Sequence, residues 1–207
     1  MKKIATLILV FFTAFGMQAQ NADKAKKLLD EVSAKIKSYS NISLDFTYQN
    51  GKQEGKGKAT IQGEKYVVDF MGISQLFDGS KIYIINPNDE EITIADANNG
   101  NSQTVSIASL LTFYKTGYSY AWDKTQTVGG KSIQYIKLTP KSSKDVKEIY
   151  LGIDTKTKHI HSRTDVFKGG SKSIITVNSF KTNQTLSKNH FTFTKSKYPN
   201  YYINNLD

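Results

Sequence analysis

The sequence contains no cysteine among its 207 residues. This absence excludes disulfide bonds, thiolate metal sites and a cysteine nucleophile, and it also excludes the lipid-modified N-terminal cysteine of a lipoprotein. Arginine is nearly absent too, because Arg163 is the only one among the 28 basic residues. Proteins that read nucleic acids commonly use arginine for bidentate contacts, and the lysines here are scattered along the chain. The composition therefore predicts no nucleic-acid partner.

The first 20 residues have the composition of an export signal. Two lysines supply a positive start, residues 4–17 form an almost unbroken apolar run, and Ala19 places a small residue before the cleavage point. The run is short for a membrane span, and basic stop-transfer residues do not follow it. We therefore expect a cleaved signal peptide at residues 1–20, in preference to an N-terminal membrane anchor, and a single domain at residues 21–207. Cleavage lowers the formal net charge from +10 to +8.

The predicted elements are one amphipathic helix followed by many short strands. Apolar residues recur at three- and four-residue spacing in residues 21–39, which predicts a helix that packs one stripe on a sheet. Alternation of apolar and polar residues is typical of half-buried strands. It predicts strands at residues 42–48, 55–61, 66–70, 82–85, 92–94, 118–127, 131–138, 146–153, 158–167 and 171–180, a late strand at Phe191 and Phe193, and a polar tail at residues 198–207.

Turn residues separate these strands at regular intervals. The Asp-Gly pair at residues 78–79 and the Gly-Gly pair at residues 129–130 are typical of tight hairpins. The Asn-Pro-Asn-Asp segment at residues 86–89 ends one strand before the next begins. This spacing predicts a large antiparallel sheet. Because alternate residues of a strand share a face, residues 55–96 predict a meander with one strongly apolar face.

A second helix, apolar nearly all round, is predicted at residues 105–114. Such a helix must be covered on more than one side. Two interpretations stay open: ordinary packing on the sheet, or a lid that lifts from an apolar cavity. In the lid interpretation the covering side chains are Leu110, Leu111 and Phe113.

Residues that would carry catalysis are not grouped in this sequence. Residues 129–132 (GGKS) match the end of a phosphate-binding loop, but Thr125 stands where its first glycine belongs, and the segment joins strands instead of opening a helix. His159 and His161 share one face of a predicted strand without a cluster of further metal ligands. The nucleophile pattern Gly-x-Ser-x-Gly does not occur. We therefore expect no enzyme activity, no catalytic residue, no metal and no cofactor.

Several segments together resemble one known family. They read QEGKG at residues 53–57, KYVVDF at residues 65–70, FDGSKIYIINP at residues 77–87 and LTPK at residues 138–141. Combined with the export signal, the amphipathic helix and the long meander, these segments are similar to the periplasmic outer-membrane lipoprotein carrier family, LolA. The resemblance covers nearly all of the chain that follows the export signal.

The resemblance implies a fold and a function. The implied fold class is mainly β, an unclosed antiparallel β-barrel (a half-barrel) whose concave side is covered by an α-helical lid. The implied function is a periplasmic carrier, a monomer, that binds lipoprotein acyl chains in a hydrophobic trough. It would receive them from an inner-membrane ABC-type lipoprotein-releasing complex and pass them to an outer-membrane acceptor. Residues 62–64 read QGE where family members commonly carry an Arg-Pro pair that secures the lid, so this latch is absent or built differently.

The alternating strands supply candidate walls for such a trough. Each buried methylene of an acyl chain contributes about 0.8 kcal/mol, so the chain requires continuous apolar surface. The candidate acyl-binding residues are Leu44, Phe46, Tyr66, Val68, Phe70, Ile82 and Ile84 from strands, with Leu110, Leu111 and Phe113 from the lid. Two alternative functions stay open: a binder of another lipid or glycolipid on the same fold, and a non-enzymatic envelope sensor that docks a partner's peptide.

Overall fold

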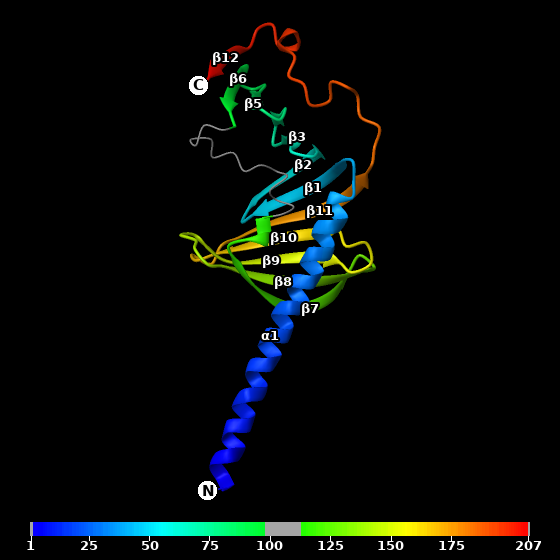
Figure 1. Ribbon diagram of the computed structural model, residues 1–207. Helices are drawn as coiled ribbons and strands as arrows, with labels where there is room; N and C mark the ends of the chain where they lie inside the picture. Colours follow the sequence, from blue (N-terminus) through cyan, green and yellow to red (C-terminus); the bar gives the residue numbers. More distant parts are fainter. Residues whose placement is uncertain (1, 98–112, 207) are drawn as a thin grey trace. The chain divides into compact units, whose positions relative to one another are not determined.

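The computed structural model describes residues 2–97 and 113–206, with the side chains of the first helix described from residue 20 (Figure 1). Helix α1 spans Lys2–Lys37. Strands β1 to β6 are Ile42–Asn50, Gln53–Gln62, Lys65–Phe70, Ile73–Phe77, Lys81–Asn86 and Glu91–Asp96. Strands β7 to β12 are Tyr118–Val128, Lys131–Pro140, Val146–Asp154, Ile160–Phe167, Lys172–Thr182 and Tyr202–Asn205. Two short 3-10 helices, η1 and η2, are Phe113–Lys115 and Lys195–Lys197.

The twelve strands form one sheet in the order β12-β6-β5-β4-β3-β2-β1-β11-β10-β9-β8-β7. Neighbours that follow each other in the chain pair antiparallel, whereas β12 pairs in parallel with β6. The sheet is unclosed, and α1 is the one α-helix among the residues that the structure describes. The predicted fold class, mainly β with an unclosed antiparallel sheet, is therefore confirmed.

The turns predicted between strands are present, but one strand predicted for the C-terminal region is absent. Residues 78–79, 86–89 and 129–130 join β4 to β5, β5 to β6 and β7 to β8. Phe191 and Phe193, expected in a late strand, lie in a segment of turns. The tail expected to be polar contains β12. Phe193 packs on the sheet through Tyr83 of β5, so the spacing of the two aromatics does not mark a strand of their own.

The second predicted helix falls almost entirely outside the described residues. Leu110 and Leu111 are not among them. Phe113 is described, and it is half-buried at the start of η1. The lid interpretation therefore stays a prediction.

Internal contacts divide the chain into two compact units. Unit 1 comprises Met1–Ile36 and Tyr114–Lys172, and it contains strands β7 to β10 with nearly all of α1. Unit 2 comprises Lys37–Phe113 and Ser173–Asp207, and it contains β1 to β6, β12 and most of β11. The prediction of a single domain at residues 21–207 stays a prediction.

In unit 1 the apolar stripe of α1 is buried, at the three- and four-residue spacing that the sequence shows: Ala25, Leu28, Leu29 and Val32. The hydroxyl of Tyr114 donates to the carbonyl of Leu29 at 3.3 Å. Lys24 lies 4.6 Å from the ring centroid of Trp122 on β7, and Glu31 pairs with Lys158, which precedes β10, at 3.0 Å. These contacts place the helix on the sheet of its own unit, as predicted.

No helix within the described part of the chain is both long enough and apolar enough to cross a membrane.

In unit 2 both faces of the sheet are covered in part. We call front face the side of β1 to β5 that carries Leu44, Val68 and Ile84, and back face the opposite side. Back-face residues Leu76, Ile85 and Ile92 are 8%, 6% and 0% exposed. The C-terminal segment covers this side, because the ring of Phe193 stacks on Tyr83, a back-face residue of β5, with centroids 4.5 Å apart. Phe193 also stacks on Tyr198 at 5.9 Å.

Candidate binding site

Strand register brings the predicted strand residues together on the front face. Leu44 pairs with Ala59, Ala59 with Val68, Val68 with Gln75, and Gln75 with Ile84. Residues in register point to the same side of an antiparallel sheet, about 5 Å apart. The two flanking rows are Ile42, Ile61, Tyr66, Phe77 and Ile82 on one side and Phe46, Gly57, Phe70 and Ile73 on the other. All seven predicted strand residues (Leu44, Phe46, Tyr66, Val68, Phe70, Ile82 and Ile84) share this face; that they bind acyl chains stays a prediction.

Burial changes along the front face. Tyr66, Val68 and Ile82 are 1%, 6% and 5% exposed, whereas Phe46 and Phe70 are only half-buried. The accessible part is therefore the row that contains Phe46 and Phe70, at the end of β3 where the chain turns into β4.

The central row of the front face contains one polar residue, Gln75, and its side chain is hydrogen-bonded. The side-chain amide of Gln75 donates to the hydroxyl of Tyr66 at 3.1 Å. Burial raises the pKa of Tyr66, so its hydroxyl stays neutral. Because the two groups satisfy each other, they cost little in apolar surroundings.

Two glycines of β2 let aromatic rings lie across that strand. A Cβ added to Gly57 would lie 2.8 Å from Cε2 of Phe46, and one added to Gly55 would lie 3.0 Å from Cε2 of Phe70. Any larger residue would push these rings away from the sheet. The rings of Phe46 and Phe70 are 5.7 Å apart, and Tyr48 meets Phe70 edge-on at 5.6 Å. The glycines thus create an aromatic cluster at the accessible end of the front face.

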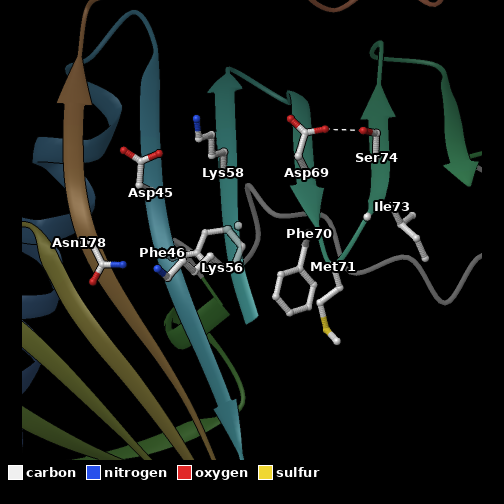
Figure 2. Close-up of a pocket in the computed structure, with 12 residues that line it drawn as sticks. Asp45, Phe46, Lys56, Lys58, Asp69, Phe70, Met71, Ile73, Ser74 and Asn178 are labelled. Carbon is white, nitrogen blue, oxygen red and sulfur yellow. Dashed lines mark hydrogen bonds between the residues drawn. The ribbon is translucent and has the colours of Figure 1, made fainter. Parts of the chain in front are cut away.

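A pocket of about 430 Å³ lies beside this cluster (Figure 2). Its apolar border consists of front-face residues and the β3–β4 turn: Phe46, Phe70, Met71 and Ile73. Its polar border consists of Asp45, Lys56, Lys58, Asp69, Ser74 and Asn178. Figure 2 shows Asp69 facing Ser74 on the neighbouring strand, and the Ser74 hydroxyl donates to this carboxylate. The pocket therefore offers apolar surface and charged groups side by side.

The β3–β4 turn exposes apolar side chains at the edge of the pocket. Met71 is 56% exposed and Ile73 is 40% exposed. Phe70 pairs with Ile73, so Met71 and Gly72 form a two-residue loop, and their φ angles are 51° and 81°. Positive φ at both positions is what a type I′ hairpin turn requires. Glycine adopts it freely, but methionine does so at a cost in free energy.

The hairpin that carries Ile82 is held by a carboxylate. Asp78 accepts hydrogen bonds from the backbone N–H groups of Ser80 and Lys81, both at 2.8 Å, and from the Tyr83 hydroxyl at 3.1 Å. Burial alone would raise the pKa of Asp78, but these hydrogen bonds, with the nearby Lys65, outweigh it and lower the pKa. The Asp-Gly turn signal in the sequence thus has an electrostatic role in positioning β5.

The other candidates from the sequence do not form a site. The segment that resembles a phosphate-binding loop is the turn between β7 and β8. Burial lowers the pKa values of His159 and His161. Among the described residues, no group of three or more histidine, cysteine, aspartate or glutamate side chains could hold a metal ion.

The residues that shape the accessible end of the front face are not predicted from the sequence. Met71 and Ile73 sit at a turn, where no alternation marks them. Asp45, Lys58 and Asp69 come together only through strand register, which the sequence does not specify. The Gly-x-Gly pattern at residues 55–57 was the available signal, since glycine within a strand marks close approach of another group.

The family model of the outer membrane lipoprotein carrier protein LolA matches residues 73–194, which is more than half of the chain. No curated protein sequence matches the chain.

Among solved structures, the chain is similar to an uncharacterized conserved protein from Thermus thermophilus, with a TM-score of 0.64 at 9% sequence identity, covering 88% of this chain and 99% of that one. At such low identity the likeness concerns the fold alone. A putative outer membrane lipoprotein-sorting protein domain from Vibrio parahaemolyticus gives a TM-score of 0.48 at 9% identity, with 83% and 97% of the two chains covered. The MucA/MucB complex of Pseudomonas aeruginosa gives 0.45 at 12% identity, with 83% and 61% covered. We draw nothing from these two weaker likenesses.

Proposed function

Because this chain belongs to the family of the outer membrane lipoprotein carrier protein LolA, we propose that it is a periplasmic carrier of lipoprotein acyl chains. Residues 1–20 direct its export and are then removed. An inner-membrane ABC-type lipoprotein-releasing complex loads the carrier, and an outer-membrane acceptor unloads it. The proposed function consists of binding and release of acyl chains, and it involves no catalytic residue and no cofactor.

The observation that carries the proposal is the continuous apolar front face of unit 2. Two register rows run across β1 to β5 and a third runs across β1 to β4, and their side chains are apolar apart from Gln75. The row of Phe46, Phe70 and Ile73 borders an open pocket. Each methylene that leaves water gains about 0.8 kcal/mol, which a surface of this kind supplies without specific anchors. Unloading requires contacts that are easily broken, and aromatic and aliphatic side chains fit this need better than a polar pocket does.

The decisive experiment measures binding of a fluorescent fatty-acyl probe to the purified protein. Phe46→Glu places a charge in the accessible row, and it is expected to weaken binding at least tenfold because a buried carboxylate opposes an apolar ligand. Thr47→Glu is the matched control, since the next residue of β1 points to the back face. It should bind the probe as the native protein does. Circular dichroism checks that both variants are folded.

A second variant tests the same end of the face by shape instead of charge. Gly57→Ala forces the ring of Phe46 away from the sheet, so the probe is expected to bind several-fold more weakly. Adding Phe46→Leu to Gly57→Ala removes the crowding ring and should recover part of the lost affinity. Absence of saturable probe binding by the native protein, or equal binding by Phe46→Glu and Thr47→Glu, contradicts the proposal.

The nature of the cargo is a separate question with its own measurement. Mass spectrometry of material that copurifies with the protein from an envelope extract is expected to find diacylated or triacylated lipoproteins. Free lipids or glycolipids in their place would favour the alternative binder on the same fold. A partner peptide bound without any acyl chain would favour the sensor alternative.

A further inference from the structure

Unit 1 contains a pocket of its own, with a volume of about 570 Å³, on the side of its sheet that faces away from α1. Trp122, Ile136 and Leu151 lie in one register row, and the ring of Trp122 contacts a lysine of α1, so this row faces the helix. Neighbouring residues of a strand point to opposite sides. Tyr135 and Tyr150, which border the pocket, therefore lie on the other side of the sheet, which we call the outer face of unit 1.

Strand β7 supplies two charged side chains to this pocket through a bulge. The pairing of β7 with β8 shifts between Trp122 and Thr125. Asp123 and Lys124 stand at this shift, and both border the pocket. The side-chain amide of Gln134, which is 1% exposed, donates to the backbone oxygens of Asp123 at 2.8 Å and Lys124 at 3.4 Å. The Thr125 hydroxyl donates to the oxygen of the same amide. Bulges re-aim side chains beside functional sites, and here a buried amide holds the bulge in place.

Two tyrosines supply aromatic surface to the pocket. A Cβ added to Gly152 would lie 3.1 Å from Cε1 of Tyr135, so the glycine lets this ring lie close to the sheet. The hydroxyl of Tyr150 donates to the carboxylate of Glu148 at 2.9 Å. Burial raises the pKa of Tyr150, and the carboxylates of Glu148 and Asp123 raise it further, so both lie near its hydroxyl. Tyr150 is therefore a half-buried ring with two carboxylates beside its polar end.

The charged groups at the pocket balance, and they disfavour most kinds of ligand. The carboxylates of Asp123 and Glu148 border it together with the ammonium groups of Lys124 and Lys172. An apolar ligand would bury these charges at a large cost, and an anion would meet two carboxylates. A cation would meet two lysines, and it would compete with Lys137, which already pairs with Glu148 at 3.6 Å. A neutral ligand with many hydrogen-bonding groups satisfies carboxylates and ammonium groups alike.

We propose that the outer face of unit 1 binds a neutral saccharide, with Asp123 and Glu148 accepting hydrogen bonds from sugar hydroxyls and Tyr150 carrying a sugar ring. Hydroxyl groups donate to carboxylates and accept from ammonium groups, and such charge-assisted bonds are stronger than neutral ones. The C–H face of a sugar ring packs on the negative face of an aromatic ring. The site lies wholly in unit 1, whereas the acyl-binding residues of the carrier proposal belong to unit 2. The saccharide is thus a second ligand, and the inference does not depend on the carrier function.

The test is isothermal titration calorimetry of the purified full chain with two neutral trisaccharides, maltotriose and tri-N-acetylchitotriose. At least one of them is expected to bind saturably. Tyr150→Leu should weaken that binding about tenfold, because the stacking ring is lost. Tyr120→Leu is the matched control: Tyr120 is also half-buried, but it pairs with Leu138 on the side that faces α1. Its affinity for the trisaccharide should change less than about twofold. Circular dichroism checks that both variants are folded.

A second pair of variants tests the carboxylates without changing the shape of the side chain. Asp123→Asn is expected to weaken trisaccharide binding about fivefold, because a neutral acceptor replaces a charged one. Asp145→Asn removes the same charge from an exposed residue that does not border the pocket, and it should bind the trisaccharide as the native chain does.

The outcomes separate this site from the carrier function. Absence of saturable binding of both trisaccharides, or equal affinities of Tyr150→Leu and Tyr120→Leu, overturns the saccharide site. Tighter binding of the peptide trilysine than of either trisaccharide would also overturn it, in favour of a basic ligand. The fluorescent acyl probe should bind to Tyr150→Leu as it does to the native chain, so a failure of the carrier function shows in that probe alone.

Discussion

Met71 occupies a backbone conformation that few side chains adopt. With φ at 51° it stands where a type I′ turn favours asparagine or glycine, and its side chain is 56% exposed beside the pocket. A strained residue with an exposed apolar side chain is unfavourable for stability on both counts. Strained residues of this kind cluster at functional sites. We interpret Met71 as an apolar edge of the pocket that the chain keeps at a cost in free energy.

Met71→Asn is therefore expected to stabilise the protein while weakening cargo binding. Asparagine tolerates positive φ, so the gain is up to about 1 kcal/mol, or a rise of about 2–4 °C in melting temperature. Loss of the methionine contact should weaken binding of the acyl probe about threefold. Thermal unfolding and probe titration measure the two effects. Met71→Gly is the control, with a similar gain in stability. A lower melting temperature for both variants would show that the turn is not strained.

Asp78 makes the stability of unit 2 depend on pH. Its pKa in the folded protein is lowered from the ordinary 3.8, so folding favours its ionised form. This contribution is present above pH 3.8 and is lost as the pH falls through the lower folded value. Asp78→Ala should cost about 1 kcal/mol in free energy of unfolding at about pH 7, because the turn loses its acceptor.

The difference between native protein and Asp78→Ala is expected to narrow as the pH is lowered from about 5 to about 3. Urea unfolding at several pH values measures it. Asn88→Ala, at the next turn, is the neutral control, and its effect should not vary with pH. A difference between native protein and Asp78→Ala that stays constant over this whole range would contradict this account.

Among the elements, the C-terminal segment does more for the fold than its polar sequence suggests. Phe193 lies between Tyr83 and Tyr198 in a stack of rings. Beyond it, Tyr202 donates its backbone N–H to the carbonyl of Glu90 at 2.8 Å, and Leu206 donates to that of Ile94 at 2.9 Å. The segment thus closes the back face of β5 and adds a strand to β6, without touching the front face through these contacts.

Phe193→Ala should therefore destabilise the protein by about 2 kcal/mol, since a half-buried ring and its stacking are lost. The melting temperature is expected to fall by about 4–8 °C. Tyr202→Ala is the control, because its side chain is 69% exposed, and it should change stability by less than about 0.5 kcal/mol. Thermal unfolding followed by circular dichroism measures both. Equal melting temperatures for the two variants would show that the stack contributes nothing.

The sequence predicts elements well where a single period governs them. Alternation assigned Tyr66, Val68 and Phe70 to one face because a strand has period two, and the front face follows. The same rule failed at Phe191 and Phe193, since alternating aromatics also occur outside strands, and here Phe193 packs on Tyr83 of β5. Gln134 shows another limit: it is 1% exposed, and its amide donates to the backbone oxygens of Asp123 and Tyr135, both at 2.8 Å. No local pattern indicates such an arrangement.

For the whole molecule, composition and resemblance predict the fold class, but the pocket depends on long-range register. Asp45 and Asp69 are far apart in the sequence and meet at Lys58 only because β1, β2 and β3 pair as they do. A shift of one residue in the β1–β2 ladder would turn Asp45 to the front face, and such a shift in the β2–β3 ladder would turn Asp69 there. The charged border of the pocket is therefore a property of the assembled sheet.

The proposed export signal at residues 1–20 leads to a prediction for the whole chain. In α1 the buried stripe begins at Ala25, and residues 20–24 are exposed or half-buried. Removal of residues 1–20 thus leaves every contact described between α1 and the sheet in place. A chain that begins at Asn21 is expected to melt within about 2 °C of the full-length chain, as for changes that touch no packed group. A chain that begins at Ala34 loses Leu28, Leu29 and Val32, and it should fail to fold.

Cleavage itself is tested by mass spectrometry of the protein recovered from a periplasmic extract, which should give the mass of the chain without residues 1–20. Recovery of the protein at its full-length mass would contradict cleavage. It would favour the alternative in which the first helix is a membrane anchor.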